Sequence, residues 1–348
     1  MKNRIFSFFY RLIRYTSVHF LFIYQWILGK PKDLESIIDF GDRNLAFIYK
    51  KVPFIYDFKI PSGIQVDLFN LTFPSPLTAA SFKLEPEILD IWLKMGLGSV
   101  TLKTVTENKR TGNKRPRLQQ IKYKGHSTLI NSIGLPGPGI EFLAKNLSDF
   151  QLWNYKRPVG ISIGGDSKKE YVENSKKIIK ALKEKKNYFL ELNISCPNTT
   201  SGKTLADNLF DLERTIDEVR KFSDQVISIK ISPDMTTKNL QCIGEIAKSA
   251  SRCFINAGNT QFKTIKELGI PKDLFAMRGG GISGSFIFPR MLKIVELYSG
   301  MGLKVMATGG ISELSHVKSA FEKGASLVGM ASALIMDPFC IPKINSKL

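Results

Sequence analysis

From Leu71 onward, short apolar runs rich in β-branched residues alternate with polar, amphipathic stretches. This alternation is typical of βα units, in which each strand is followed by a helix that covers the sheet. We expect strands at 77–82, 98–106, 159–164, 188–195, 226–232, 253–259, 304–308 and 326–331. Eight parallel strands with helices between them fit a (β/α)₈ TIM barrel of roughly 250 residues. The predicted fold class is therefore α/β, with an N-terminal helical extension before the barrel.

The first 32 residues differ from the rest because they carry six basic and no acidic side chains. Two apolar blocks, 5–13 and 18–28, are rich in aromatics, and the second is about half the roughly 20 residues that a spanning helix needs. We predict two short helices lying in a membrane interface, with Arg11 and Arg14 toward lipid phosphates. The alternatives are a helical pair packed on the protein's own core and, in third place, a single spanning helix. The expected division is a membrane-associating extension, 1–65, and a catalytic barrel, 66–348.

The charge balance narrows the choice of partners. Fifty basic and 31 acidic side chains leave a net charge of +19, which favours a polyanionic neighbour, either nucleic acid or an anionic membrane surface. The basic residues are scattered, and no helix-turn-helix or aromatic-interleaved RNA motif is present, so no nucleic-acid partner is expected. Four cysteines without a CxxC pair, far from three separated histidines, indicate a reduced intracellular protein without a metal site.

In a TIM barrel the carboxyl ends of the strands carry the active site. The residues expected there or in the adjoining loops are rich in asparagine, lysine and glycine: Lys103, Asn131, Gly134, Leu135, Asn193, Cys196, Asn198, Lys230, Asn259, Thr260, Gly309, Gly310 and Ser332. Asparagine amides both donate and accept, so a ring of them suits a planar, imide-like ligand. A strand-end lysine supplies a cation for a carboxylate or for an electron-rich cofactor ring.

Cys196 is the candidate base. The expected strand ends contain no histidine and no obvious carboxylate pair, which leaves this thiol as the leading group for acid–base work. A lone cysteine is more often a buried small apolar residue, and this interpretation holds for Cys242, Cys253 and Cys340. We depart from it for Cys196 because Asn193 and Asn198 flank it in a proline-containing loop.

Two glycine runs predict a phosphate site. Residues 279–284 follow the sixth expected strand, and Gly309 and Gly310 close the seventh. TIM barrels often bind phosphate with their last loops and a short additional helix. No GxGxxG run lies between a strand and a helix, so a dinucleotide fold is not expected. One phosphate indicates a mononucleotide cofactor or a phosphorylated substrate.

Four motifs together resemble the dihydroorotate dehydrogenase family. They are NISCPN at 193–198, KTVT at 103–106 with GNKRPR at 112–117, INSIGLP at 130–136, and GGISG at 280–284. The resemblance extends from about residue 71 to residue 338. It implies an FMN-containing barrel that oxidises dihydroorotate to orotate in de novo pyrimidine (UMP) biosynthesis. A hydride would pass from substrate C6 to flavin N5, while Cys196 removes the C5 proton.

The resemblance also assigns the other site residues. Lys103 would hold the substrate carboxylate near the flavin, and Lys230 would stabilise negative charge at flavin N1/O2. Substrate contacts would come from Lys103, Asn131, Gly134, Leu135, Asn193, Asn198, Asn259 and Thr260. FMN contacts would come from Ala80, Ser81, Lys103, Asn193, Lys230, Gly284, Gly309, Gly310 and Ser332.

The resemblance is mixed between two classes of the family. A cysteine base marks the soluble class, whereas the N-terminal extension resembles the membrane-bound class that uses quinone. Gln120 and Ala331 stand where the membrane class has an arginine and usually a tyrosine that line its quinone tunnel. Phe82 stands where the soluble class has glycine beside the flavin. We expect quinone as acceptor and peripheral attachment at the cytoplasmic side of a membrane. The alternatives are a soluble acceptor or protein partner and a soluble cytoplasmic enzyme; the expected partners also include a second copy in a homodimer.

A flavin-dependent reductase of another pyrimidine, similar to the flavin domain of dihydropyrimidine dehydrogenase, is the alternative function. That relative shares the cysteine and the asparagine ring, but its electron path needs iron–sulfur clusters, for which this cysteine spacing is unsuited. Lys103 also weighs against it, because uracil has no carboxylate to bind.

Replacing Cys196 by alanine should slow substrate-driven flavin reduction by about 10² or more while FMN stays bound, because a positioned base is lost. Serine should retain part of the activity, and Cys242→Ala should behave like the parent protein. Stopped-flow absorbance of the flavin measures the rate, and a normal rate in the Cys196→Ala protein would contradict the assignment.

Overall fold

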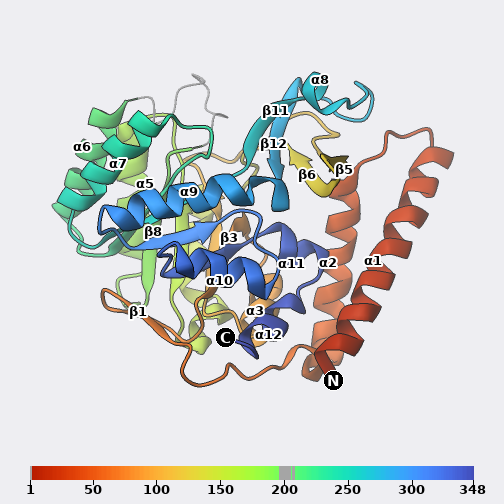
Figure 1. Cartoon of the computed structure of the whole chain (residues 1–348), viewed down its shortest axis with the longest axis horizontal. Helices are drawn as coiled ribbons and strands as arrows, with labels where there is room; N and C mark the ends of the chain where they lie inside the picture. Colours follow the sequence, from red (N-terminus) through yellow and green to blue (C-terminus); the bar gives the residue numbers. More distant parts are fainter. Residues whose placement is uncertain (1, 196–204, 206–207) are drawn as a thin grey trace.

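The computed structural model describes residues 2–195, 205 and 208–348, and its centre is a closed barrel of eight parallel strands (Figure 1). Around the barrel the strands follow the order β10-β13-β14-β3-β4-β7-β8-β9. They span β3 Leu77–Lys83, β4 Ser99–Val105, β7 Val159–Ile163, β8 Tyr188–Asn193, β9 Val226–Lys230, β10 Cys253–Asn256, β13 Val305–Thr308 and β14 Leu327–Met330. The predicted (β/α)₈ barrel is confirmed, although several strands end earlier than expected.

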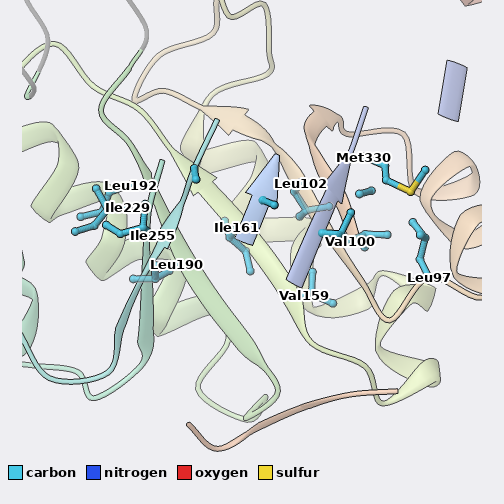
Figure 2. Packing of buried hydrophobic residues seen from close by; sticks show 14 of the residues in the cluster. Leu97, Val100, Leu102, Val159, Ile161, Leu190, Leu192, Ile229, Ile255 and Met330 are labelled. Atoms are coloured by element: carbon cyan, nitrogen blue, oxygen red, sulfur yellow. The ribbon is translucent and has the colours of Figure 1, made fainter. Parts of the chain in front are cut away.

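Helices cover the outside of the barrel (Figure 1). They are α3 Pro86–Lys94, α4 Ile140–Asn146, α5 Lys168–Ala181, α6 Leu209–Arg220, α7 Thr237–Ser249, α9 Phe288–Gly300, α10 Leu314–Glu322, α11 Ser332–Met336 and α12 Cys340–Asn345. Alternate residues of each strand point toward these helices and form the main core. Figure 2 shows Leu192, Ile229 and Ile255 from three neighbouring strands gathered side by side.

The amino-terminal end of the barrel is closed by an antiparallel hairpin of β1 Val66–Leu68 and β2 Leu71–Phe73. Its residues Leu68, Leu71 and Phe73 pack against Phe189 and Phe254 of the strands in a separate buried cluster. This apolar cluster closes that end of the barrel, so the opposite end is the one available to a ligand.

A four-stranded antiparallel sheet lies beside the carboxyl end of the barrel, in the order β11-β12-β6-β5. Its strands are β11 Gln261–Thr264, β12 Gly279–Ser283, β6 His126–Asn131 and β5 Leu118–Tyr123, and α8 Ile265–Leu268 follows β11. The glycine run that we expected as a phosphate loop therefore begins as strand β12. A Cβ on Gly281 would lie 1.9 Å from Thr260 Oγ1, and one on Gly280 would lie 2.5 Å from Asn131 O. Glycine is required here because the strand packs directly against two predicted site residues.

The N-terminal extension forms two helices, but not those that we predicted. A single helix, α1 Lys2–Ile27, joins both apolar blocks, and α2 Leu34–Lys51 follows it. The expectation was wrong because the polar residues between the blocks do not end a helix. Thr16 Oγ1, for example, donates back to Leu12 O at 3.1 Å within the same helix. Arg14 donates to the Gln120 side chain (2.9 Å), and Arg11 lies 3.7 Å from Asp337, so both arginines contact the chain itself.

Helix α1 has two apolar sides. One side packs on the chain, where Phe6 and Tyr10 contact the main core and Val18, Leu21 and Phe22 contact a cluster around α2. The other side exposes large apolar side chains to solvent: Ile5, Phe8, Phe9, Leu12, Ile13, Tyr15, Phe20, Ile23, Tyr24, Trp26 and Ile27. Within the described residues, no helix combines the length and apolarity needed to cross a membrane.

Helix α2 lies between α1 and the barrel and is held there by ion pairs (Figure 1). Arg117 donates two hydrogen bonds to the Glu35 carboxylate, at 2.8 and 2.7 Å, and Arg115 donates to Asp33, the N-cap residue of α2, at 2.6 Å. Lys83 pairs with Asp42 further along the helix. Burial alone would raise the pKa of Glu35, but the hydrogen bonds and charge of Arg117 hold this pKa below its ordinary value.

Replacing Glu35 by glutamine should increase hydrogen exchange of the α2 amides about 30-fold, because a hydrogen bond between charged groups contributes about 2 kcal/mol. The folded-state pKa of Glu35 is lowered, so its contribution is present near neutral pH and is lost as the pH falls from about 5 through that pKa. The variant should therefore lose the acid-dependent part of the protection. Glu245→Gln, exposed on α7 and unpaired within the described chain, is the control.

Candidate active site

A cavity of about 750 Å³ opens at the carboxyl ends of the barrel strands, a size typical of sites for small molecules. The structure brings together most of the predicted site residues on its walls: Ala80, Ser81, Lys103, Asn131, Gly134, Leu135, Asn193, Lys230, Asn259, Thr260, Gly309, Gly310 and Ser332. Cys196 and Asn198 lie outside the described residues.

Hydrogen bonds join the predicted amides into a chain. Asn259 Nδ2 donates to Ser195 Oγ at 2.7 Å, and Ser195 Oγ donates to Asn193 Oδ1 at 2.9 Å. Asn193 Nδ2 then donates to Thr104 Oγ1 at 2.8 Å, and the Tyr171 hydroxyl donates to the Asn193 carbonyl at 2.7 Å. Because each amide is bonded to a neighbour, the two asparagines keep fixed orientations at the cavity wall.

Lys230, at the end of β9, belongs to a second network at the cavity floor. Its ammonium donates to Ser81 Oγ at 2.9 Å, and Ser81 donates to Glu191 Oε1 at 2.6 Å. Asn256 Nδ2 donates to the other carboxylate oxygen at 2.7 Å. All four side chains are buried, and Asn256 Oδ1 has no hydrogen-bond partner among the described residues. The floor therefore presents a restrained cation.

Lys103, on β4 three strands around the barrel from β9, has a different environment. Within the described part of the chain its ammonium has no hydrogen bond and no ion pair. Burial lowers the pKa of Lys103, and the nearby charges of Lys83 and Arg117 act in the same direction, while Glu85 and Glu35 oppose them. An anion entering the cavity would supply the missing counter-charge.

Glycines keep part of the cavity surface free of side chains. A Cβ on Gly258 would lie 1.5 Å from Thr308 O, and one on Gly329 would lie 2.1 Å from Thr308 Oγ1. Gly310 has φ +74°, and a Cβ there would lie 2.8 Å from Gly284 O. Gly284 itself is not among the lining residues, and it begins the turn into the 3₁₀ helix Ser285–Ile287. Backbone alone forms the surface at Gly258, Gly329 and Gly310, which suits a flat group or a phosphate.

Residues of α2 line part of the cavity. The lining there and nearby includes the apolar side chains Ile38, Leu118, Leu129, Ile335 and Phe82 and the charged side chains Glu35, Asp39, Lys83 and Glu85. Burial raises the pKa of Asp39, and the charge of Glu35 adds to this effect. Ala331 lines the cavity, whereas Gln120 is not among the lining residues and bonds to Arg14 and Ser127.

Sequence reasoning missed several residues of the site. Glu191 carried a signal, because a carboxylate in the otherwise apolar run 188–192 must point into the barrel or into the helices. Ser195 was part of a quoted motif but was given no role. Glu35 and Asp39 carried no signal, because only the docking of α2 brings them to the cavity.

Comparisons with known proteins agree with this geometry. The family model described as dihydroorotate dehydrogenase matches residues 63–348. The catalytic subunit of dihydroorotate dehydrogenase B (NAD(+)) from Bacillus mycoides is 31% identical over 292 residues, which covers 82% of this chain and 90% of that protein. The corresponding subunit from Anoxybacillus flavithermus is 30% identical over 293 residues, with 82% and 89% covered.

Solved structures with a similar fold include ligand-free DHODH from Eimeria tenella. Its TM-score is 0.74 at 21% identity, covering 88% of this chain and 92% of that one. The complex of Eimeria tenella DHODH with ferulenol gives a TM-score of 0.73 at 20% identity, with 89% and 90% covered. At this level of identity these structures support the fold alone.

Proposed function

The chain belongs to the dihydroorotate dehydrogenase family, a family of flavin-dependent oxidoreductases, and we propose that it oxidises dihydroorotate to orotate in pyrimidine biosynthesis. The observation that carries this proposal is the cavity that contains the fixed amides of Asn193 and Asn259, the restrained cation Lys230 and the unpaired cation Lys103. The same residues suit a planar imide ring with a carboxylate.

The residues present fit FMN as the cofactor. The side-chain-free surface at Gly258, Gly329 and Gly310 gives room for a flat ring and a phosphate, and Thr308 Oγ1, from a residue of the cavity lining, is buried without a partner among the described residues. Ala80, Ser81, Lys230, Gly309 and Ser332 would hold it, with Lys230 near the ring. Bound FMN would supply a two-electron acceptor for a hydride.

The chain's own residues would bind and orient the substrate. Lys103 would pair with its carboxylate, and Asn131, Asn193, Asn259 and Thr260 would hydrogen-bond its ring and carboxylate. Cys196 remains the proposed base on sequence grounds. A reductase for another pyrimidine remains the alternative, but an uncharged pyrimidine ring would leave Lys103 buried without a counter-ion.

For the electron acceptor we propose quinone, which would enter beside α2. The apolar lining residues Ile38, Leu118, Leu129 and Ile335 support this proposal, while the carboxylates of the same lining and the relatives named NAD(+)-linked support a soluble acceptor or a protein partner.

We also propose that residues 1–65 form a membrane-associating extension of the catalytic barrel, 66–348. The support is the exposed side of α1, where Phe20 and Trp26 are 70% and 75% exposed.

An anaerobic absorbance spectrum, recorded before and after adding dihydroorotate, tests the function. Yellow protein that bleaches is expected. Yellow protein that dihydroorotate does not bleach, but that the dihydro form of another pyrimidine does bleach, would favour the alternative reductase, and protein that takes up no FMN would contradict the proposal.

Replacing Lys103 by alanine should weaken orotate binding about 30-fold, because a buried carboxylate loses its charged hydrogen-bond partner. The pKa of Lys103 is lowered, so the affinity of the parent protein should fall as the pH rises through that pKa, and the variant should lack this dependence. Lys122→Ala, exposed on β5, is the control. Unchanged affinity, measured by titration of the flavin spectrum, would exclude this role for Lys103.

The two finer proposals have separate tests. Reduction of a soluble quinone analogue by the dihydroorotate-reduced enzyme is expected, and turnover with fumarate or NAD⁺ but with no quinone would contradict quinone as the acceptor.

Binding to anionic lipid vesicles should weaken in Trp26→Ser but not in Phe210→Ser, which alters an exposed aromatic on α6. Equal binding by both variants would contradict attachment through α1.

A further inference from the structure

Glu191 is a carboxylate inside the barrel to which the proposed reaction gives no role. It lies in the middle of β8 with 0% of its surface exposed, and its register neighbour on β9 is Ser228. Burying a charged carboxylate costs several kcal/mol unless hydrogen bonds and an opposite charge compensate it. A chain that needed only a filled barrel would have an apolar residue here, so the position requires an explanation.

The contacts of Glu191 lead to Lys230 through one hydroxyl group. Ser81 donates to Oε1 at 2.6 Å, Asn256 donates to Oε2 at 2.7 Å, and Lys230 donates to Ser81 Oγ at 2.9 Å. A serine hydroxyl has one proton and two lone pairs. Because the Ser81 proton is donated in the hydrogen bond to Glu191, a lone pair of the Ser81 hydroxyl is left to accept a hydrogen bond from Lys230. The ammonium then has one N–H fixed and two N–H groups available to the cavity.

We propose that Glu191 is a positioning residue for Lys230, and that its negative charge tempers the positive potential that the cavity floor presents to the bound flavin ring. This inference rests on the proposed function in one respect, namely that FMN occupies the cavity. Neutralising Glu191 has two consequences. The floor gains one net positive charge, and the Ser81 hydroxyl exchanges a charged carboxylate acceptor for a weaker, neutral amide oxygen. A carboxylate that merely tied β3, β8 and β10 together would produce neither effect on the flavin.

The test compares Glu191→Gln with Glu191→Asp and with Ser228→Ala. Glutamine removes the charge at nearly constant shape. Aspartate keeps the charge but is one methylene too short for the same bond to Ser81. Ser228 is the matched control because it is buried beside Glu191 and its hydroxyl has no partner within the described chain. For each FMN-loaded protein the midpoint potential of the flavin and the dissociation constant of FMN are measured.

In Glu191→Gln we expect the ratio of reduced to oxidised flavin at a fixed potential to rise at least tenfold, an upward shift of about 30 mV for a two-electron couple. The direction follows because removing a negative charge favours the form that carries more negative charge. Glu191→Asp should keep the ratio within about threefold of the parent protein, while its FMN dissociation constant should rise about tenfold. Ser228→Ala should change neither quantity by more than about threefold.

An unchanged or lowered potential in Glu191→Gln, with the parent protein loaded with FMN, would overturn this inference and leave the proposed function intact. Parent protein that takes up no FMN would instead contradict the proposed function itself. If the glutamine variant does not fold, the aspartate variant decides, since a parent-like FMN dissociation constant in that protein would overturn the positioning role.

Discussion

The structure depends on one constraint of a closed parallel barrel. Alternate residues of each strand point into the barrel interior, where only side chains from the other strands can contact them. At the amino-terminal end, Phe189, Phe254 and the hairpin β1–β2 fill it with apolar groups. Toward the carboxyl end the inward positions become polar, and Ser81 and Asn256 each donate a hydrogen bond to the Glu191 carboxylate. Most buried polar groups in folded proteins are hydrogen-bonded, and these side chains accordingly form a network. The upper surface of that network is the cavity floor.

The same requirement for compensation explains the N-terminal extension. Lys83 lines the cavity, Arg115 and Arg117 directly precede β5, and the positive charges of all three side chains need compensation. Helix α2 supplies Glu35 and Asp42, and its N-cap residue Asp33 adds a third carboxylate. The helix is therefore part of the cavity wall rather than an appendage, and the exposed side of α1 lies on the outer face of the same unit (Figure 1).

Local sequence patterns correctly predicted those elements whose formation depends on neighbouring residues in the sequence. All eight barrel strands were found because buried parallel strands are continuous apolar runs. The break expected between the two apolar blocks of α1 was wrong. Polar residues such as Thr16 form hydrogen bonds within the helix, whereas a proline would have interrupted it. The glycines of β12 were predicted to form a phosphate loop. A run of glycines is found both in such loops and in strands that pack closely against a neighbour, so the sequence did not separate the two. Glu35 and Asp39 could not be predicted, because their place at the cavity follows from long-range pairing alone.

The two lysines of the cavity differ in how their positive charges are compensated. Lys230 donates to Ser81 and through it is held by Glu191, so its charge is already compensated and fixed in place. Lys103 has no such partner within the described chain, and burial lowers its pKa. A compensated cation changes little when a neutral ring approaches, whereas an uncompensated one gains most from a carboxylate. The contrast supports the proposal that Lys230 serves a permanently bound group and Lys103 a ligand that binds and dissociates.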